Sequence, residues 1–314
     1  MKALQISEYG GADVIKLNAD APKPTIGADT VLVEVYVAGV NPVDWSIRAG
    51  YLKEMMPLKF PATLGVDFSG VVANVGKNVS DFKLGDEVYG MANAASGGSF
   101  AEYTAVPATS LAHKPAAASH TEAAALPLAG LSAWQALKDQ AKLAADQKIL
   151  IHGGAGGIGT IAVQLAKHIG AYVATTVHAD DKEYATALGA DAVIDYEHEK
   201  FEDSVSNYDV VFDTVGGEVF NRSFAVLKKG GVIVSMVEQP NEELAKEHGV
   251  TALGQFTQPN SSQLSQIAQW VDSGKVKIEI EHEFPLDEGG EALEYLKRDH
   301  RRGKVVITIK LSSK

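Results

Sequence analysis

The chain has 314 residues, 46% hydrophobic and 22% charged, which is enough for two globular domains with sizeable cores. Its net charge of −12 argues against nucleic acid or an anionic membrane as the main partner. The absence of cysteine excludes disulfides, thiolate nucleophiles and cysteine-ligated zinc sites. No signal peptide and no apolar run of membrane-spanning length is found, so we expect a cytoplasmic protein.

Residues 1–120 have the pattern of an antiparallel β domain. Short apolar or alternating segments, such as 31–37 and 70–72, are separated by Gly, Pro and Asp turns. The turn at 83–86 leads into a further predicted strand. The alanine-rich span 116–125 is expected to join this domain to the next one.

From about residue 121 the pattern changes to a repeated succession of strand, glycine and helix. The predicted elements are, in chain order, a buried strand at 149–152, a helix from Ile158 to Ile169 closed by Gly170, a strand at 171–177, a helix at 182–188, and apolar strands at 192–194, 209–212 and 232–234. This alternation predicts the α/β class, with a Rossmann doubly wound parallel sheet in a dinucleotide-binding domain over 121–254. Residues 255–314 end in a predicted strand at 304–309 and are assigned, with 1–120, to a catalytic domain.

A glycine loop follows the strand at 149–152. Its residues match the pattern G-x-G-x-x-G and are Gly154, Ala155, Gly156, Gly157, Ile158 and Gly159. We expect Gly154 to allow a tight turn, Gly156 to let a pyrophosphate approach the backbone, and Gly159 to let helix and strand pack closely. The positive end of the following helix then favours the phosphates. A glycine-rich turn without a ligand is the alternative, but the strand before the loop and the helix after it favour a bound dinucleotide.

The end of the second strand indicates which dinucleotide binds. An acid at this position accepts the adenosine ribose hydroxyls of NADH, whereas this strand ends in Val177. Three nearby side chains could contact a 2′-phosphate: Thr176, His178 and Lys182. Asp180 and Asp181 favour NADH, unless they begin the following helix, where acids are favourable. The sequence therefore predicts NADPH, with NADH as the less favoured cofactor.

Five further motifs accompany the glycine loop: AGVNPVDWSIRAG (38–50), KLGDEVYG (83–90), EAAALPLAGLSAWQAL (122–137), LGADAVIDY (188–196) and RRGKVVITI (301–309). Together they resemble the medium-chain dehydrogenase/reductase superfamily over essentially the whole chain. Within it, the chain resembles the zinc-free branch of quinone oxidoreductases and alkenal or enone reductases. The resemblance implies that the first domain is GroES-like, that the substrate is a small quinone or enone, and that the protein is a homodimer.

The resemblance also separates the chain from zinc alcohol dehydrogenases. Those enzymes carry a cysteine where this chain has Asn41, and a Gly-His-Glu where it has Gly65, Val66 and Asp67. We therefore expect no metal. Without a Lewis acid, hydride transfer suits quinones and α,β-unsaturated carbonyls, which spread the developing charge over a conjugated system. The alternatives are a non-catalytic NADPH-binding protein of the same fold and, less favoured, a zinc alcohol dehydrogenase.

Candidate substrate-pocket residues follow from the resemblance. It implies that Asn41 lies at the floor of the cleft near the nicotinamide and that Tyr51 faces the substrate or covers the core. Ser46 stands where relatives commonly carry Tyr or Lys, so the proton donor is left open between a protein group and solvent. Asp44 and Arg48 are interpreted as a structural ion pair. For the cofactor the resemblance implies contacts from Ser132, Tyr196, Val215, Gly216, Ser235, Met236, Val237, His300 and Lys304.

Overall fold

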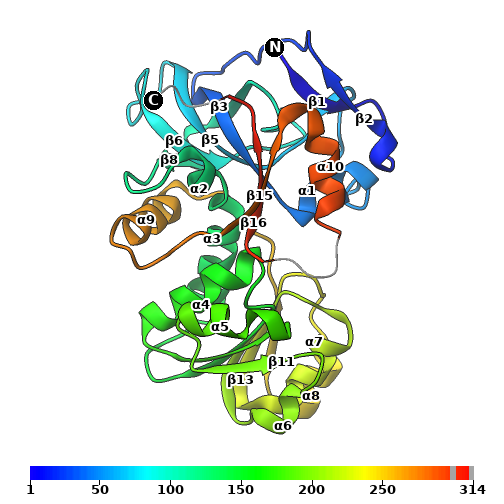
Figure 1. The fold of residues 1–314 in the computed structure, drawn as a ribbon, viewed down its shortest axis with the longest axis vertical. Helices are drawn as coiled ribbons and strands as arrows, with labels where there is room; N and C mark the ends of the chain where they lie inside the picture. The colour runs from blue at the N-terminus through cyan, green and yellow to red at the C-terminus, as the bar shows by residue number, and fades with distance from the viewer. Residues whose placement is uncertain (298–301, 311–314) are drawn as a thin grey trace. The chain divides into compact units, whose positions relative to one another are not determined.

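The structure is a computed structural model that describes residues 1–297 and 302–310 (Figure 1). The chain forms two compact units. Unit 1 comprises Met1–Leu128, Pro259–Gly274 and Ile278–Lys314, and unit 2 comprises Ala129–Gln258 and Lys275–Lys277. The functional division predicted above, with limits at 120 and 255, stays a prediction.

Unit 1 contains the antiparallel β structure that the sequence predicts. Its main sheet has seven strands in the order β15-β16-β3-β5-β6-β8, with β7 also paired to β3. The strands are β3 (Thr30–Val40), β5 (Asp67–Val75), β6 (Glu87–Met91), β7 (Tyr103–Pro107), β8 (Leu111–His113), β15 (Ile280–Pro285) and β16 (Lys304–Thr308). A second sheet has the order β2-β1-β4, formed by β2 (Ile15–Asn18), β1 (Ala3–Ile6) and β4 (Ala62–Thr63). All pairs are antiparallel except β15 with β16.

The core of unit 1 explains this arrangement. Alternate residues of β3 point into one cluster, in which Val31, Val33 and Val35 pack with Phe68 and Val88. The late strand β16 pairs with β3, and this pairing returns the C-terminal segment to unit 1. The helices of the unit are α1 (Pro42–Ala49), α2 (His120–Ala124), α9 (Ser261–Asp272) and α10 (Gly289–Tyr295).

Unit 2 contains the predicted doubly wound parallel sheet. Its six strands lie in the order β11-β10-β9-β12-β13-β14, and every pair is parallel. They are β9 (Lys148–His152), β10 (Tyr172–Val177), β11 (Ala192–Asp195), β12 (Tyr208–Asp213), β13 (Leu227–Ser235) and β14 (Thr251–Gly254). The strand order reverses between β9 and β12, where ligands of such sheets bind beyond the carboxyl ends.

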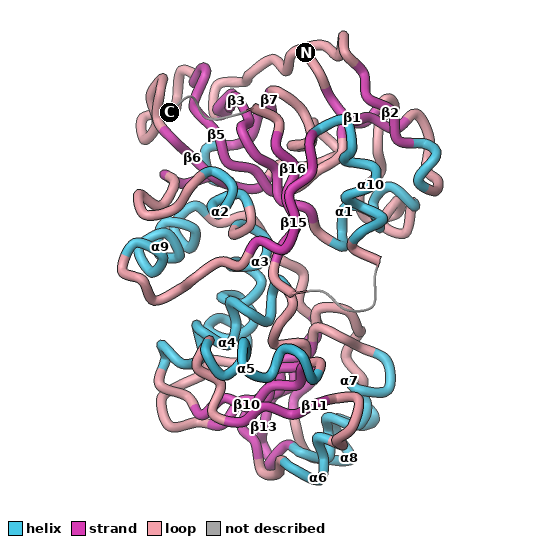
Figure 2. The backbone as a smooth tube through the Cα atoms, viewed as in Figure 1, coloured by secondary structure: helices cyan, strands magenta, loops and turns pink. Residues whose placement is uncertain are grey.

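Helices cover both faces of this sheet (Figure 2). Side chains of β10 and β11 alternate between the two faces of the sheet. On one face Val177 and Val193 pack against α5. On the other face Ala174 and Ile194 pack in the cluster that contains Phe201 of α6. The helices are α4 (Gly157–Ile169), α5 (Lys182–Ala187), α6 (Phe201–Ser204), α7 (Gly217–Ser223) and α8 (Glu242–His248). α3 (Pro127–Trp134) crosses the boundary of the two units and runs into a π-helix at Gln135–Gln140, which the sequence did not predict.

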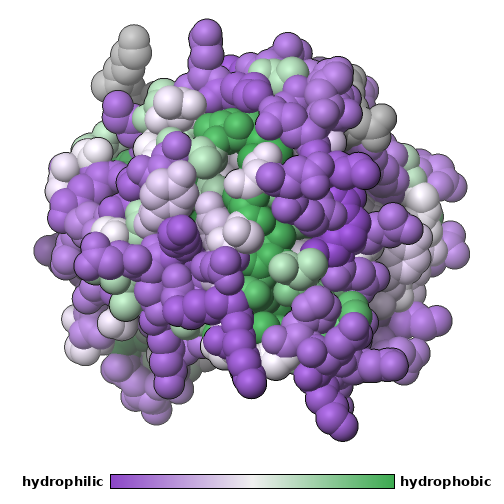
Figure 3. Space-filling model, turned by 90° about the horizontal axis from the view of Figure 1, so that it is seen from below, coloured by the Kyte–Doolittle hydropathy of each residue, from purple (hydrophilic) through white to green (hydrophobic). Residues whose placement is uncertain are grey.

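The described surface is that of an ordinary globular protein. Figure 3 shows one face, on which hydrophilic side chains surround a narrow strip of hydrophobic residues. Across residues 1–297 and 302–310, no helix combines the length and the hydropathy needed to cross a bilayer.

Candidate active site

The glycine loop begins where β9 ends. Gly153 has φ of +75°, so the backbone adopts the left-handed conformation one residue before Gly154. The N–H groups of Gly153 and Gly154 both donate to the Thr176 carbonyl, at 3.2 and 3.1 Å, which ties the loop to the end of β10. The N–H of Gly156 donates to the Gly153 carbonyl at 3.0 Å and closes the turn.

The remaining glycines differ in what a side chain would meet. A Cβ at Gly154 would lie 2.0 Å from the Thr175 hydroxyl, and one at Gly159 would lie 2.0 Å from the Gly153 carbonyl oxygen. At Gly156 the nearest atom would be that same oxygen at 3.4 Å, which is an ordinary contact. Gly154 and Gly159 therefore serve packing within the protein. Gly156 is not required by packing, so a ligand at the backbone is a sufficient reason for its lack of a side chain.

The loop opens onto the N-terminus of α4, a helix of 13 residues with no acidic residue in its first turn. Gly156, Gly157 and Ile158 are only half-buried, whereas Ala155 packs in the core against Val177 and Ala185. The unpaired N–H groups of the first turn and the helix dipole favour an anion at this position. The loop thus has the local geometry of a pyrophosphate cradle.

Thr176 supports the glycine loop from inside the protein. Its side chain is buried, and its hydroxyl lies 3.1 Å from Nδ1 of His152 and accepts a hydrogen bond from Gly153 N at 3.3 Å. Burial lowers the pKa of His152 to about 4, so this histidine is neutral near pH 7. A contact between Thr176 and a phosphate stays a prediction.

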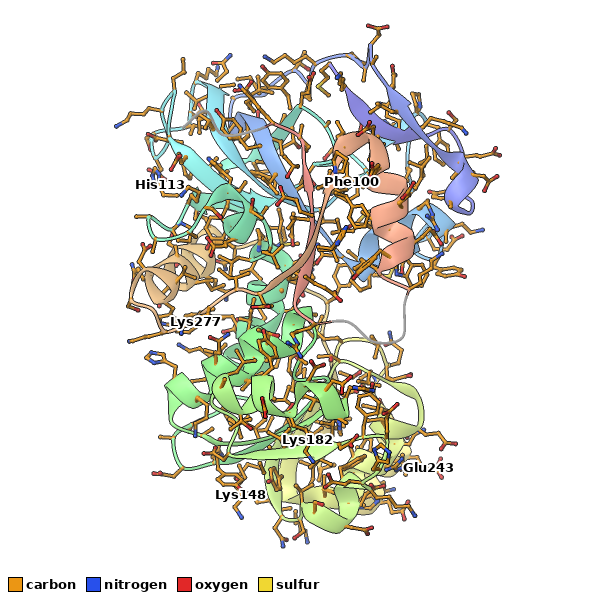
Figure 4. The ribbon with its side chains drawn as sticks, viewed as in Figure 1. Phe100, His113, Lys148, Lys182, Glu243 and Lys277 are labelled. Carbon is orange, nitrogen blue, oxygen red and sulfur yellow. The ribbon has the colours of Figure 1, made fainter. Side chains whose placement is uncertain are left out.

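The other predicted strand-end residues lie at the surface of unit 2. His178 Nε2 is 3.0 Å from a Glu197 carboxylate oxygen, and Lys182 Nζ is 2.9 Å from Glu199 (Lys182 is labelled in Figure 4). The Tyr196 side chain is exposed, and its ring centroid lies 6.2 Å from that of His178. Donors and an aromatic ring therefore gather at the carboxyl ends of β10 and β11, together with carboxylates that already hold the donors.

Two later loops of the same sheet edge are organised by Asp213, a residue that the sequence analysis missed. Its fully buried carboxylate accepts hydrogen bonds from Val215 N at 3.0 Å, Gly216 N at 2.9 Å and the Ser235 hydroxyl at 2.7 Å. The Ser235 hydroxyl in turn accepts from Val237 N at 3.2 Å. Val215, in the first loop, and Val237, in the second, are exposed, so the network presents both loops to solvent at the carboxyl edge. Met236 lies in the second loop, between Ser235 and Val237. The position of Asp213 directly after the apolar residues of β12 was the sequence feature that could have indicated its role.

Ser132 is fully buried in α3, and its hydroxyl lies 2.6 Å from that of Thr257. Gln135, in the π-helix, bonds both the N–H and the carbonyl of Gln258, at 3.0 and 2.7 Å. These contacts hold the segment 255–258 against α3. Ser132 is therefore a packing partner inside unit 2, and a contact with cofactor stays a prediction.

In unit 1 one of the predicted pocket residues, Asn41, belongs to a buried polar network. Asn41 Nδ2 donates to Asp67 at 2.9 Å, and its Oδ1 accepts a hydrogen bond from Lys304. Lys304 also donates to the Val40 carbonyl at 3.3 Å and lies 3.9 Å from Asp67. Lys304 is buried and acts as an internal cation in this network, and a contact between Lys304 and the cofactor stays a prediction.

Asp44 and Arg48 do not pair with each other, so that interpretation is wrong. Asp44 accepts from Asn41 N at 2.8 Å in a capping box at the start of α1. Arg48 is fully buried and binds Glu294 of α10 at 2.7 Å. Burial raises the pKa of Asp44 to about 8 and that of Asp67 to about 6, and Lys304 opposes both shifts. At neutral pH this network therefore holds a proton on Asp44.

The remaining pocket candidates are more exposed. The Ser46 hydroxyl donates to the Pro42 carbonyl at 3.1 Å. Tyr51 is 74% exposed and makes an edge contact with Trp45, with ring centroids 5.8 Å apart. Tyr51 therefore does not cover the core. His300 lies outside the described residues.

Comparisons with known proteins cover nearly the whole chain. Residues 27–116 match the alcohol dehydrogenase GroES-like domain, and residues 188–307 match the zinc-binding dehydrogenase family. A chloroplastic NADPH-dependent alkenal/one oxidoreductase of Arabidopsis thaliana is 39% identical over 98% of this chain and 79% of its own length. The chain belongs to the medium-chain dehydrogenase/reductase superfamily, in its quinone oxidoreductase branch.

Solved structures of this branch have the same fold. The quinone oxidoreductase from Coxiella burnetii matches with a TM-score of 0.92 and 36% identity, over 99% of both chains. The Escherichia coli quinone oxidoreductase complexed with NADPH matches with a TM-score of 0.89 and 27% identity, over 98% of this chain and 100% of that one. The chain is therefore an oxidoreductase that uses a nicotinamide cofactor.

The name of the matched zinc-binding family raises the question whether these residues fit zinc. At the positions where zinc enzymes of the superfamily carry Cys and His, this chain has Asn41 and Val66, and the adjacent Asp67 faces the Lys304 ammonium. An amide, an apolar side chain and a paired carboxylate are a poor donor set for zinc. Within the described ranges, one group of side chains is close enough to ligate a metal, Asp195, Glu197 and His198, and it lies in unit 2 at the end of β11.

Proposed function

We propose that this protein is an NADPH-dependent, metal-free reductase that transfers a hydride to quinones or α,β-unsaturated carbonyls. The observation that carries the proposal is the glycine loop, in which Gly156 is open to a ligand at the start of a helix that favours anions. The relatives named above support NADPH as the cofactor and a quinone or enone as the acceptor. The donor set around Asn41 and Lys304 supports chemistry without zinc.

The residues of the chain would divide the work as follows. The first-turn N–H groups of α4 would bind the pyrophosphate, and the loops ordered by Asp213 would contact the nicotinamide half at the carboxyl edge of the sheet. When bound, NADPH supplies the hydride. Lys304 and Asp67 would hold the Asn41 amide in one orientation, because both of its ends are engaged.

The reaction also consumes one proton for each hydride. In the described residues, Asn41 is buried and bonded, and the Ser46 hydroxyl is engaged with the helix backbone. We therefore infer that solvent, which also reaches the exposed Tyr51, protonates the hydroquinone monoanion, or the α-carbon of the enolate, that hydride transfer leaves. A conjugated acceptor tolerates this arrangement because its charge is delocalised.

The test is NADPH oxidation, followed by the absorbance of the reduced nicotinamide, with a naphthoquinone, an alkenal, butanal and no acceptor. We expect turnover with the first two, little with butanal, and no loss of rate after treatment with a chelator. Comparable rates with butanal that disappear on chelation would contradict the proposal in favour of a zinc alcohol dehydrogenase. Tight NADPH binding without turnover of any acceptor would favour a non-catalytic binding protein.

The cytoplasmic location and the homodimer are further proposals, and light scattering of the purified chain tests the dimer.

A further inference from the structure

The carboxyl ends of β10 and β11 carry two donor–carboxylate pairs that the proposed reaction does not require. His178 Nδ1 accepts from Asp180 N at 3.2 Å, so its Nε2 is placed to donate to Glu197 at 3.0 Å. Lys182, at the start of α5, binds Glu199 at 2.9 Å. The side chains of Lys182, Glu197 and Glu199 are each more than 40% exposed, so a ligand can reach both pairs.

The two glutamates are held in place by the backbone of their own turn. Asp195 accepts from Glu197 N at 3.0 Å through its side chain and from Glu199 N at 2.8 Å through its carbonyl. Glu199 also accepts from Asp195 N at 3.3 Å. The hydrogen bond with Lys182 lowers the pKa of Glu199 and raises that of Lys182, so both are charged at neutral pH. Glu199 is therefore a fixed negative charge at this edge.

This edge is where a sheet of this kind meets the adenosine ribose. NADPH brings a 2′-phosphate of nearly two negative charges to that position, whereas NADH brings a hydroxyl. A phosphate needs His178 and Lys182 as donors, but it meets Glu197 and Glu199 already bonded to them. A hydroxyl makes no such demand. The carboxylates of Glu197 and Glu199 should therefore weaken the binding of NADPH more than the binding of NADH.

We propose that Glu197 and Glu199 set the cofactor selectivity of this chain by occupying His178 and Lys182, so that NADPH binds only by displacing them. The inference rests on the proposed function, because it concerns the ribose end of the same cofactor site. We expect the chain to prefer NADPH over NADH by a smaller factor than a site in which no carboxylate is bonded to the cations.

The test measures dissociation constants of NADPH and of NADH on the full chain, by nucleotide fluorescence without any acceptor. Glu197→Gln and Glu199→Gln should each tighten NADPH about three- to tenfold, because one charge near a phosphate at a solvated site changes affinity by about that amount. NADH should change less than about twofold. The gain for NADPH should shrink at high salt, because exposed charges are screened.

Asp191→Asn is the matched control. Asp191 pairs with Lys167 at 2.7 Å, at the opposite end of the same two strands, so this variant removes a charge and an ion pair without touching the ribose end. Both nucleotides should bind it as they bind the unaltered chain. Lys182→Met tests the same site from the other side and should weaken NADPH while leaving NADH unchanged.

Unchanged affinity for NADPH in both glutamate variants would overturn the inference, as would equal tightening of NADPH and NADH, which indicates only a change in the general field. Thermal melting identifies a glutamate variant that fails to fold, and the result for the other glutamate variant then decides. Failure of the unaltered chain to bind either nucleotide would instead overturn the proposed function. The two failures are therefore distinguishable.

Discussion

One added methyl group should affect protein stability differently at two glycines of the same loop. Gly156 has φ of −75° and ψ of 172°, a conformation that alanine adopts freely, and its Cβ would meet nothing closer than 3.4 Å. At Gly159 a Cβ would lie 2.0 Å from the Gly153 carbonyl oxygen and 2.8 Å from Gly154 Cα. These neighbours are backbone atoms, so the loop and α4 must move apart to admit it.

The expected magnitudes follow from these contacts. For Gly156→Ala the reduced freedom of the unfolded chain offsets the poorer helix cap, so the free energy of unfolding should stay within about 1 kcal/mol. If a pyrophosphate contacts this backbone, losing one charge-assisted hydrogen bond weakens NADPH by about 1.5–3 kcal/mol, which is roughly ten- to a hundredfold. Gly159→Ala should cost about 1–3 kcal/mol or more in stability from overpacking.

Two measurements separate the effects, a thermal melt without nucleotide and an NADPH titration by calorimetry. Gly156→Ala should melt with the unaltered chain and bind NADPH poorly. Gly159→Ala should melt several degrees lower and also bind poorly, because its loop is displaced. A Gly156→Ala variant that binds NADPH with unaltered affinity would refute the view that the open backbone at Gly156 exists for the cofactor.

Three further predictions concern unit 1. Burial raises the pKa of Asp44 from 3.8 to about 8, so the stabilising contribution of this carboxyl is full below pH 3.8 and is lost as the pH rises through 8. Urea unfolding should therefore show the free energy of unfolding falling between pH 5 and 8. Asp44→Asn should remove that part of the slope. Lys304→Met leaves the buried Asp67 carboxylate without its cation and should lower the free energy of unfolding by about 3–5 kcal/mol at pH 8. The loss should be smaller below pH 6, where Asp67 is protonated, and a loss of stability that does not depend on pH would contradict this. Tyr89→Phe removes a buried 2.6 Å hydrogen bond to the Leu264 carbonyl and should cost about 1–2 kcal/mol, with NADPH affinity unchanged in the same titration.

Much of unit 2 could be predicted from the sequence because its signals are local. The apolar stripe of α4 and its glycine cap occur within one helix, and the loop before it lies between a strand and that helix. The strands β9 to β12 and the second half of β13 are largely apolar runs, as is typical of parallel strands covered on both faces. The short strand β14 was missed because four residues, Thr251–Gly254, carry too little pattern to distinguish a strand from a loop.

The errors share one physical origin. The spacing of Asp44 and Arg48 on one helix favours a local ion pair, but Glu294 reaches Arg48 from a distant part of the chain. The burial of Lys304 could not be predicted either, because nothing in its sequence neighbours shows that β16 pairs with β3 and places this side chain against Asn41. Asp213 was overlooked for the same reason, since its three partners lie in two different loops.

The amino-acid sequence by itself therefore determined most elements of unit 2, the class of sheet and the position of the glycine loop, because periodicity and glycine placement act over a few residues. Only the tertiary structure decided which polar groups are buried together. Taking a charge out of water is costly unless another group meets it, and that partner is chosen by packing between distant segments. Asn41, Asp67 and Lys304 are such a case, because β16 pairs with the distant strand β3 and buries the ammonium beside the amide and the carboxylate.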